Sequence, residues 1–344
     1  MKATYMYGSG DVRVEDASYP TILKPTDAVI RTVVACVCGS DLWDYYNFPA
    51  GRERVAKGHE TLGLVEAVGA DVKNFKPGDL VVVPFVASCG TCDFCQMGLQ
   101  TSCRSIEFFG HDGGAALQAE AARIPHADGT MVKLPVAADS PLIPSLLTLS
   151  DVLCTGYHAA VTAGVRPGDT VTVIGDGAVG LSAVIGAKKK GAERIILVSR
   201  HEARSALGRE YGATDIVTER DAEGIARIKD LTNGDGTHRV LEAVGTQSAI
   251  DMAIAICRAG GSIGRVGAAQ YQNVPLDFGT IMRNITVTGG VAPARHYIEE
   301  LMPDILDGTI NPGKMFDITV GIDDIATGYK AMADRTAIKA LVQF

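Results

Sequence analysis

Long apolar stretches are absent from this 344-residue sequence. No run approaches the roughly twenty apolar residues that a membrane-spanning helix needs, which argues against a membrane span. The first twenty residues contain no apolar run suited to a secretory signal peptide. Basic residues are fewer than acidic ones, 32 against 40, and the net charge of −8 argues against a nucleic-acid partner, because neutralising phosphates needs a basic surface. Internal repeats and low-complexity segments are also lacking.

The composition is that of a compact α/β protein. Hydrophobic residues make up 47% of the chain, and there are 39 glycines. A chain of this length favours two domains, each able to bury a core. Reduced thiols and the lack of a targeting signal together predict the cytoplasm.

The first half of the chain has the pattern of strands and turns. Segments rich in β-branched residues predict strands at 29–36, 61–69 and 79–85, with a turn signal at 76–79. We therefore expect an irregular, barrel-like β domain here.

From about residue 151 the pattern changes to apolar strands alternating with amphipathic helices. A helix is expected at 151–163, and strands at 170–175, 194–199, 215–218, 238–245, 260–267 and 284–290. This alternation predicts a parallel, doubly wound sheet. The tail beyond 290 ends in a further strand, which we expect to rejoin the first domain. The first domain would then be discontinuous, 1–150 and 291–344, around a dinucleotide-binding domain of 151–290.

Half of the eight cysteines lie within fifteen residues. They are Cys89, Cys92, Cys95 and Cys103. The spacing C-x2-C-x2-C-x7-C can bring four thiolates into a tetrahedron around Zn²⁺. Such a site has no open position for substrate, so the lobe at 89–103 is predicted to hold a structural zinc. A disulfide framework is less favoured because it is typical of short secreted chains, while an iron–sulfur cluster or a redox pair stays open.

A glycine motif, G-D-G-A-V-G, lies between the first strand and the first helix of the alternating region. Gly175 permits a tight turn, Gly177 allows the backbone to approach a pyrophosphate, and Gly180 lets helix and strand pack closely. Ala178 and Val179 open the helix, whose amides are expected to meet the phosphates. The position of the motif at a strand-to-helix turn favours a dinucleotide site over a turn without a ligand.

The end of the second strand predicts which dinucleotide binds. An acidic residue there would accept hydrogen bonds from the 2′-hydroxyl of NAD, but this chain has Ser199 and Arg200, followed by His201 and Arg204. A hydroxyl and a guanidinium can bind a 2′-phosphate, so NADP(H) is favoured. Alternatively, Arg200 is a solvated residue at a helix start. Tyr211 is a candidate for contact with the adenine, although core packing would explain it equally well.

Two further segments, C-G-S-D at 38–41 and G-H-E at 58–60, complete a resemblance. With the four-cysteine lobe and the glycine motif, in this order, the chain resembles the zinc-dependent alcohol dehydrogenases of the medium-chain dehydrogenase/reductase superfamily, in particular microbial NADP-dependent secondary-alcohol dehydrogenases. The resemblance covers nearly the whole length. It implies a GroES-like, β-rich catalytic domain and a Rossmann cofactor domain. It also implies hydride transfer between an alcohol, ketone or aldehyde and NADP(H), with two zinc ions per chain.

The resemblance implies a set of ligands for a catalytic zinc. Cys38 and His59 would bind it with a third ligand from the start of the cofactor domain, for which we choose Asp151, with Cys154 as the alternative. Glu60 is expected behind the metal, as a transient ligand. A zinc ion with an open coordination position can bind the alcohol oxygen and lower the pKa of its hydroxyl, which suits alcohol oxidation.

The resemblance also implies a proton path and a substrate pocket. Ser40 would accept the alcohol proton and pass it on through the cofactor ribose. Trp43 stands where family members often have a histidine, and because indole only donates, the path must end at solvent or at another group. Trp43 is expected to narrow the pocket instead, and Phe85 aligns with a pocket aromatic. Weaker pocket candidates are Phe108, Phe109 and His111.

Three positions late in the chain are expected at the cofactor. Lys339 resembles a basic residue that contacts the pyrophosphate, and the backbone of Val266 and Gly290 is placed near the carboxamide. By resemblance the chain forms a homo-oligomer, a tetramer. The alternatives are a polyol or amino-alcohol dehydrogenase of the same fold and a non-catalytic NADP(H)-binding protein.

Overall fold

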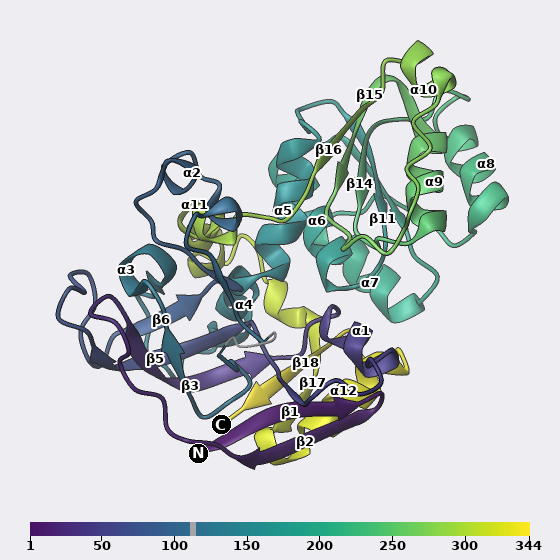
Figure 1. Ribbon diagram of the computed structural model, residues 1–344. Helices are drawn as coiled ribbons and strands as arrows, with labels where there is room; N and C mark the ends of the chain where they lie inside the picture. The colour runs from purple at the N-terminus through teal and green to yellow at the C-terminus, as the bar shows by residue number, and fades with distance from the viewer. Residues whose placement is uncertain (111–114) are drawn as a thin grey trace. The chain divides into compact units, whose positions relative to one another are not determined.

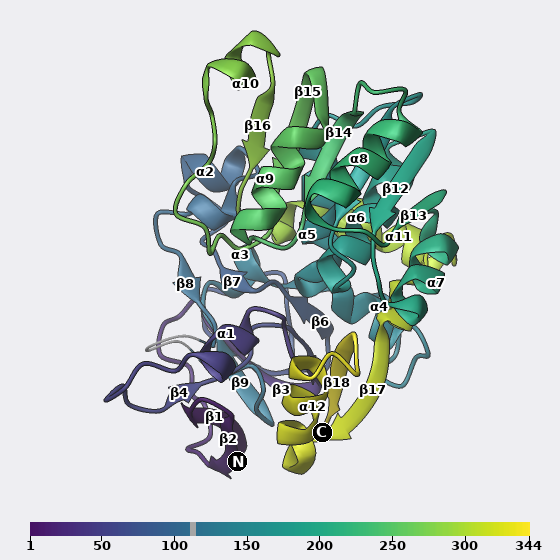
Figure 2. The same ribbon diagram turned by 90° about the vertical axis from the view of Figure 1, so that its right-hand side faces the viewer.

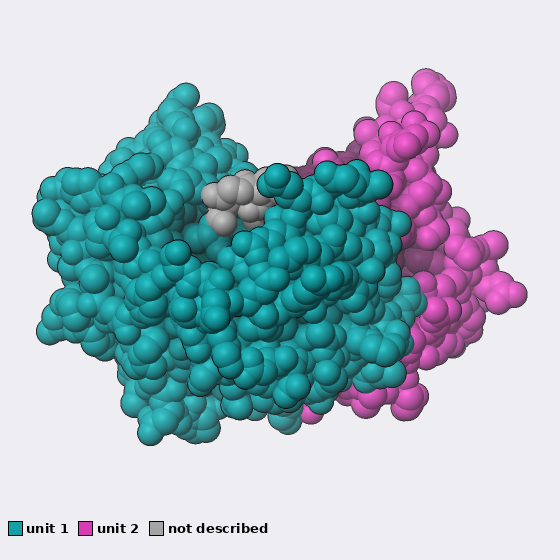
Figure 3. Space-filling model, turned by 60° about the horizontal axis from the view of Figure 1, so that its bottom comes forward, with its two compact units in different colours: residues 1–151, 293–344 teal, residues 152–292 magenta. Residues whose placement is uncertain are grey.

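The protein is described by a computed structural model that covers residues 1–110 and 115–344. It divides into two compact units, one of residues 1–151 with 293–344 and one of residues 152–292 (Figure 3). These boundaries lie one and two residues from the expected ones, so that Asp151 belongs to the first unit. Among the described residues, no helix combines the length and apolarity needed to cross a membrane.

The main sheet of the first unit combines strands from residues 28–133 with the last two strands of the chain. Its strand order is β10-β6-β5-β3-β18-β17, and β9 also pairs with β3. Figure 1 labels β3, β5, β6, β17 and β18 of this sheet. The strands are β3 (Ala28–Cys36), β5 (Thr61–Val68), β6 (Leu80–Val83), β9 (Ala121–Ile124), β10 (Val132–Lys133), β17 (Phe316–Gly321) and β18 (Lys339–Gln343). Because Leu341 lies opposite Cys36 in the β18–β3 pair, the last strand runs beside the segment that leads to Cys38.

Short elements complete the first unit. A second sheet has the order β2-β1-β4, and a two-stranded sheet of β7 and β8 lies at the two ends of the cysteine lobe. These strands are β1 (Lys2–Gly8), β2 (Asp11–Asp16), β4 (Val55–Ala56), β7 (Val86–Ala87) and β8 (Glu107–Phe108). The helices are α1 (Asp41–Tyr46), α2 (Asp93–Gln96), α3 (Ala127–Thr130), α4 (Ile143–Leu147), α11 (Ala294–Leu306) and α12 (Ile325–Ala333). One core cluster packs α12 against apolar residues of β1, β3 and β18, including Met6, Ala35 and Val342.

The second unit is a six-stranded parallel sheet of order β13-β12-β11-β14-β15-β16, with helices on both faces (Figure 2). Its strands are β11 (Thr170–Ile174), β12 (Arg194–Val198), β13 (Asp215–Val217), β14 (Thr237–Glu242), β15 (Cys257–Arg265) and β16 (Thr286–Gly289). Its helices are α5 (Val152–Thr162), α6 (Ala178–Lys189), α7 (Glu202–Tyr211), α8 (Asp221–Leu231), α9 (Gln247–Ile256) and α10 (Phe278–Met282). The apolar runs of β11 and β12 are buried on both faces, as parallel strands require. The strand order reverses between β11 and β14, which is where such sheets bind dinucleotides.

Candidate metal and cofactor sites

The four cysteines of the lobe converge on one point. The Sγ atoms of Cys92 and Cys95 and those of Cys89 and Cys103 are 3.5 Å apart, and the Cys89–Cys95 and Cys92–Cys103 pairs are 4.0 Å apart. Four sulfurs at about 2.3 Å from a tetrahedral zinc would be about 3.8 Å apart. The thiol cluster therefore fits the structural zinc that the spacing predicts.

Backbone N–H groups of the lobe donate hydrogen bonds to its cysteine sulfurs, which favours the thiolate form. The N–H groups of Cys92 and Ser105 donate to Cys89 and Cys103, at 3.4 Å each. Burial opposes ionisation of Cys89, but hydrogen bonds from the N–H groups of Thr91 and Cys92, with further ones from the side chains of Thr91 and Cys103, outweigh it and lower the pKa of that thiol to about 6. Thiolates are the form that binds zinc, so these amides favour metal binding.

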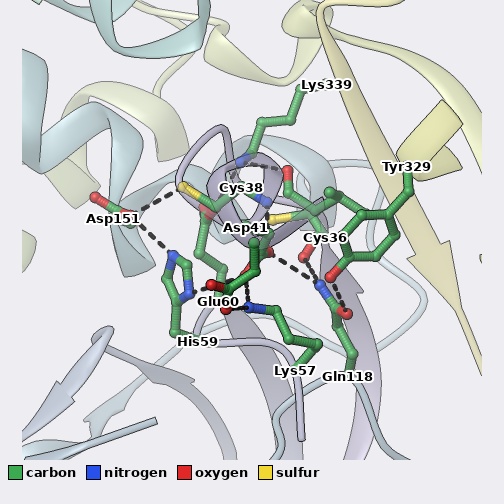
Figure 4. A network of polar contacts seen from close by, with 12 residues as sticks. Cys36, Cys38, Asp41, Lys57, His59, Glu60, Gln118, Asp151, Tyr329 and Lys339 are labelled. Atoms are coloured by element: carbon green, nitrogen blue, oxygen red, sulfur yellow. Dashed lines mark hydrogen bonds and ion pairs between the residues drawn. The ribbon is translucent and has the colours of Figure 1, made fainter. Parts of the chain in front are cut away.

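A second cluster gathers unlike donors. Cys38, His59, Glu60 and Asp151 each place one ligand atom within 4.8 Å of the others (Figure 4). The first three are buried, and the Asp151 side chain is 13% exposed. Asp151 Oδ2 lies 3.6 Å from Cys38 Sγ and 3.4 Å from His59 Nε2. Ligand atoms about 2.0–2.3 Å from a tetrahedral zinc are separated by roughly 3.3–3.8 Å. One thiolate, one imidazole and one carboxylate thus fit a zinc ion in both chemistry and spacing.

The local fold explains how Asp151 reaches this cluster. It lies between a short 3₁₀ turn (Thr148–Ser150) and α5, with φ −153° and ψ −76°. The Phe85 N–H donates to the Ser150 carbonyl at 3.0 Å, which ties the turn to the segment after β6. Cys154, the alternative ligand, is fully buried within α5 and is not part of the cluster.

The charges in this cluster call for a cation. Burial raises the pKa of Cys38, and the nearby Glu60 carboxylate raises it further. Burial also opposes charge on His59, but the anionic forms of Cys38 and Asp41 outweigh it and raise the pKa of the imidazole well above its ordinary value. Burial and the neighbouring carboxylates thus oppose a thiolate at Cys38 unless a cation lies beside it, and a divalent metal ion would supply that charge.

Lys339 lies in this cluster, which differs from the pyrophosphate contact expected from the sequence. Its side chain is 1% exposed, and its Nζ donates to Glu60 Oε1 at 2.7 Å and to the Val37 carbonyl at 3.1 Å. The ammonium neutralises Glu60 from behind. Glu60 Oε2 is buried and has no hydrogen-bond partner within the part of the chain that the structure describes, so it is free to approach a metal.

Sequence reasoning missed the polar residues that surround these donors. Asp41 Oδ2 accepts hydrogen bonds from the Cys38 N–H at 3.0 Å and from Gln118 at 3.3 Å, and its other oxygen lies 3.8 Å from His59 Nδ1. Lys57, only 2% exposed, lies 3.6 Å from Asp41, and Tyr329 donates to Gln118 at 2.9 Å. The only signal in the sequence was the position of Asp41 and Lys57 inside and beside the two short motifs.

The residues expected in the proton path and the substrate pocket differ in how far they are buried. Ser40 is half-buried at the start of α1, and its side chain makes no capping hydrogen bond, while Trp43 is 39% exposed. Phe85 is half-buried, but Phe109 is 1% exposed and packs in a core cluster. Phe108 is exposed in β8, and His111 lies outside the described residues.

The glycine motif of the second unit has the conformation that phosphate binding requires. Gly175 has φ +113°, and a Cβ on Gly180 would lie 1.9 Å from the Gly175 carbonyl oxygen. A Cβ on Gly177 would meet nothing within 4 Å, which leaves space for a ligand to approach the backbone. Ala178 and Val179 form the first turn of α6, an N-terminus suited to a pyrophosphate.

The residues expected at the ribose lie where β12 ends. Ser199 is 1% exposed and Arg200 is exposed. Tyr211 is 6% exposed at the end of α7, so most of its ring is covered by the second unit. Val266 and Gly290 follow β15 and β16, where the Gly290 N–H donates to the Arg265 carbonyl at 2.8 Å. Ser199, Arg200, Val266 and Gly290 lie beyond the carboxyl ends of their strands, the edge at which ligands bind. Tyr211 lies just before β13, at the opposite, amino-terminal edge of the sheet, so the contact with the adenine that the sequence suggested is wrong.

Comparisons with known proteins agree with this geometry. A family model described as a zinc-binding dehydrogenase matches residues 178–307, and one described as an alcohol dehydrogenase GroES-like domain matches residues 24–136. The chain is 33% identical to a zinc-type alcohol dehydrogenase-like protein of Bacillus subtilis (strain 168), over 96% of each chain. It is 32% identical to the NADP-dependent isopropanol dehydrogenase of Thermoanaerobacter brockii, over 90% of each.

A solved structure gives the same result. The alcohol dehydrogenase TADH from Thermus sp. ATN1 matches 100% of this chain with 99% of its own, at a TM-score of 0.91 and 29% identity. The chain belongs to the zinc-type alcohol dehydrogenase family, with a GroES-like domain and a Rossmann-like domain.

Proposed function

We propose that the protein is a zinc-dependent alcohol dehydrogenase or carbonyl reductase that prefers NADP(H). The buried cluster of Cys38, His59 and Asp151 carries this proposal, because a thiolate, an imidazole and a carboxylate make a zinc site with room for a fourth ligand. Support for the cofactor comes from Ser199 and Arg200 at the end of β12, and from the relative named for NADP and isopropanol.

The chain's own residues have distinct tasks in this proposal. Zinc, when bound, supplies a Lewis acid that stabilises negative charge on the substrate oxygen. Cys38, His59 and Asp151 would hold it. Burial raises the pKa of Glu60 behind it, and the Lys339 ammonium opposes that shift and favours the carboxylate. Ser40 would accept the proton that the alcohol loses as its own hydroxyl proton passes to the cofactor ribose and on toward solvent.

A panel of substrates and cofactors tests the reaction. Secondary and primary alcohols, the matching ketones and aldehydes, polyols and threonine are assayed with NADP(H) and with NAD(H). We expect the highest kcat/KM for a simple alcohol or its carbonyl partner with NADP(H). A polyol or threonine as best substrate would favour the alternative dehydrogenase, and no turnover with any of them would contradict an enzymatic function.

The phosphate site can be tested separately. Arg200→Asp should weaken NADPH and shift the ratio of specificity constants toward NADH, because a carboxylate repels the 2′-phosphate. Arg227→Asp, an equal change of charge on the exposed face of α8, is the control and should leave the ratio unchanged. An unchanged ratio in Arg200→Asp would exclude Arg200 from cofactor choice.

We also propose that the protein is a homotetramer, on the resemblance alone. Light scattering coupled to size exclusion should give a mass about four times that of the 36.1 kDa chain. A monomer mass would contradict this.

A further inference from the structure

The glycine motif carries a carboxylate that the binding of phosphates does not require. Asp176 lies between Gly175 and Gly177 and is 8% exposed. Its Oδ2 accepts a hydrogen bond from Ser199 Oγ at 2.9 Å, and its Oδ1 lies 3.5 Å from Arg204 Nη1. A nearly buried acid thus reaches from the first turn of the sheet to the end of the second strand.

The topology explains this contact. β11 and β12 are parallel neighbours, and Ile174 lies opposite Val198 in their register. Asp176 and Ser199 therefore lie two residues and one residue beyond strands that end at the same edge of the sheet. In dinucleotide-binding sheets the residue after the second strand meets the 2′-oxygen of the adenosine ribose. Ser199 holds that position here, so the Asp176 carboxylate lies within one hydrogen bond of the ribose-reading residue.

A carboxylate at this place discriminates between the two cofactors. It can accept a hydrogen bond from the 2′-hydroxyl of NAD, but it repels the dianionic 2′-phosphate of NADP. It also competes for the hydroxyl that would bind that phosphate. Ser199 Oγ is 2.9 Å from both Ser205 Oγ and Asp176 Oδ2. When Ser205 donates to Ser199, the only hydroxyl proton of Ser199 is donated to Asp176 and is not available to a phosphate.

We propose that Asp176 is a cofactor-specificity residue. It supplies, from the glycine motif, the acid that the second strand lacks, and it limits the preference for NADP(H) so that the protein also uses NAD(H). Arg204 offsets part of the charge of Asp176, and the exposed Arg200 adds attraction for a phosphate. The inference rests on the proposed function in one respect, the location of the 2′-oxygen beside Ser199 and Arg200.

Binding of two adenosine ligands tests this without turnover. Adenosine 2′,5′-bisphosphate and AMP differ only in the 2′-phosphate, and calorimetry on the full chain gives both Kd values at one fixed salt concentration. In Asp176→Asn the amide keeps the shape of the side chain but loses its charge. We expect the ratio of the AMP Kd to the bisphosphate Kd to rise about tenfold over wild type. The NADP(H)/NAD(H) ratio of kcat/KM should rise in parallel.

A matched control removes the same charge elsewhere. Asp235 is exposed in the loop before β14, at the amino-terminal edge of the same sheet. Asp235→Asn should leave the binding ratio at the wild-type value. Circular dichroism and Tm verify the fold of each variant, and Asp176→Ala replaces Asp176→Asn if the amide variant does not fold.

The outcomes separate the two proposals. An unchanged ratio in a folded Asp176 variant overturns the inference, and so does a lower ratio, which would mean that Asp176 holds Arg204 in place for the phosphate. If wild type binds the bisphosphate no better than AMP, the proposed NADP(H) preference fails. In that case, a rise in the ratio of the AMP Kd to the bisphosphate Kd in the Asp176 variant would still support the role of Asp176.

Discussion

The two candidate metal sites of the first unit have similar spacings between donor atoms, but their donors come from very different distances along the chain. The lobe draws all its donors from fifteen residues, and its backbone amides support the thiolates. The second cluster joins Cys38 to Asp151 across 113 positions, and Lys339 reaches Glu60 across 279. A short turn is sufficient for a closed site of like donors. A site with unlike donors and a free coordination position needs the tertiary fold to hold charges that would otherwise repel one another.

The largest effect is expected for the chemistry of the second cluster. Cys38→Ser should reduce kcat by three or more orders of magnitude, about 4 kcal/mol or more, because the zinc loses its anionic sulfur ligand. Metal analysis should find one zinc per chain in place of two. Cys257→Ser, at a buried cysteine in the other unit, is the control and should retain both zincs and turnover. Full activity in Cys38→Ser would contradict the proposal that the Cys38 cluster, and not the lobe, is the catalytic site.

Lys339→Met should produce the largest loss of stability. It leaves Glu60 buried without its cation, which costs about 3–5 kcal/mol in comparable buried pairs. Urea unfolding of the zinc-loaded protein measures this. Lys330→Met breaks an exposed pair with Asp334 and should cost under about 1 kcal/mol. Equal losses of unfolding free energy in the two variants would show that the buried Lys339–Glu60 pair contributes no more to stability than an exposed pair.

Cys103→Ser should damage the lobe alone. One zinc per chain is lost and Tm falls, because metal binding contributes to folding of the lobe. Most turnover should survive, since the Cys38 cluster is intact. Metal content, Tm and kcat measured on one preparation decide this, and a loss of turnover as large as in Cys38→Ser would show that the lobe takes part in the reaction.

The smallest effect is expected at the surface of the lobe. Arg104 pairs with Asp93 at 2.6 Å and lies over the Phe94 ring, but both charged side chains are more than half exposed. Arg104→Ala should therefore cost less than about 1 kcal/mol. Two zincs should remain bound. Loss of the lobe zinc would indicate that this ion pair, and not the amides alone, closes the turn.

The sequence was most informative where structure is local. The fifteen-residue spacing indicated the lobe, and the apolar runs indicated the strands of the second unit, because both depend on near neighbours. The choice of Asp151 over Cys154 came from resemblance, and the structure places Asp151 in the cluster.

The contacts that escaped prediction are long-range. Lys339 was expected at a pyrophosphate, and its position beside Glu60 follows from the pairing of β18 with β3. Gln118 reaches Asp41 from a segment 77 positions away, and Tyr329 in α12 donates to Gln118. Asp176 was overlooked because the glycine motif constrains the backbone and says nothing of the side chain between its first two glycines.

The pairing of Lys339 with Glu60 has a consequence for synthesis on the ribosome. At roughly 5–20 residues per second, Lys339 follows Glu60 by about 15–60 s. The second unit, one continuous segment, can fold during that interval, whereas the first must wait for its closing strand. A nascent chain stalled before β18 should therefore carry a folded dinucleotide domain and an accessible Cys38, which thiol labelling of arrested chains would detect.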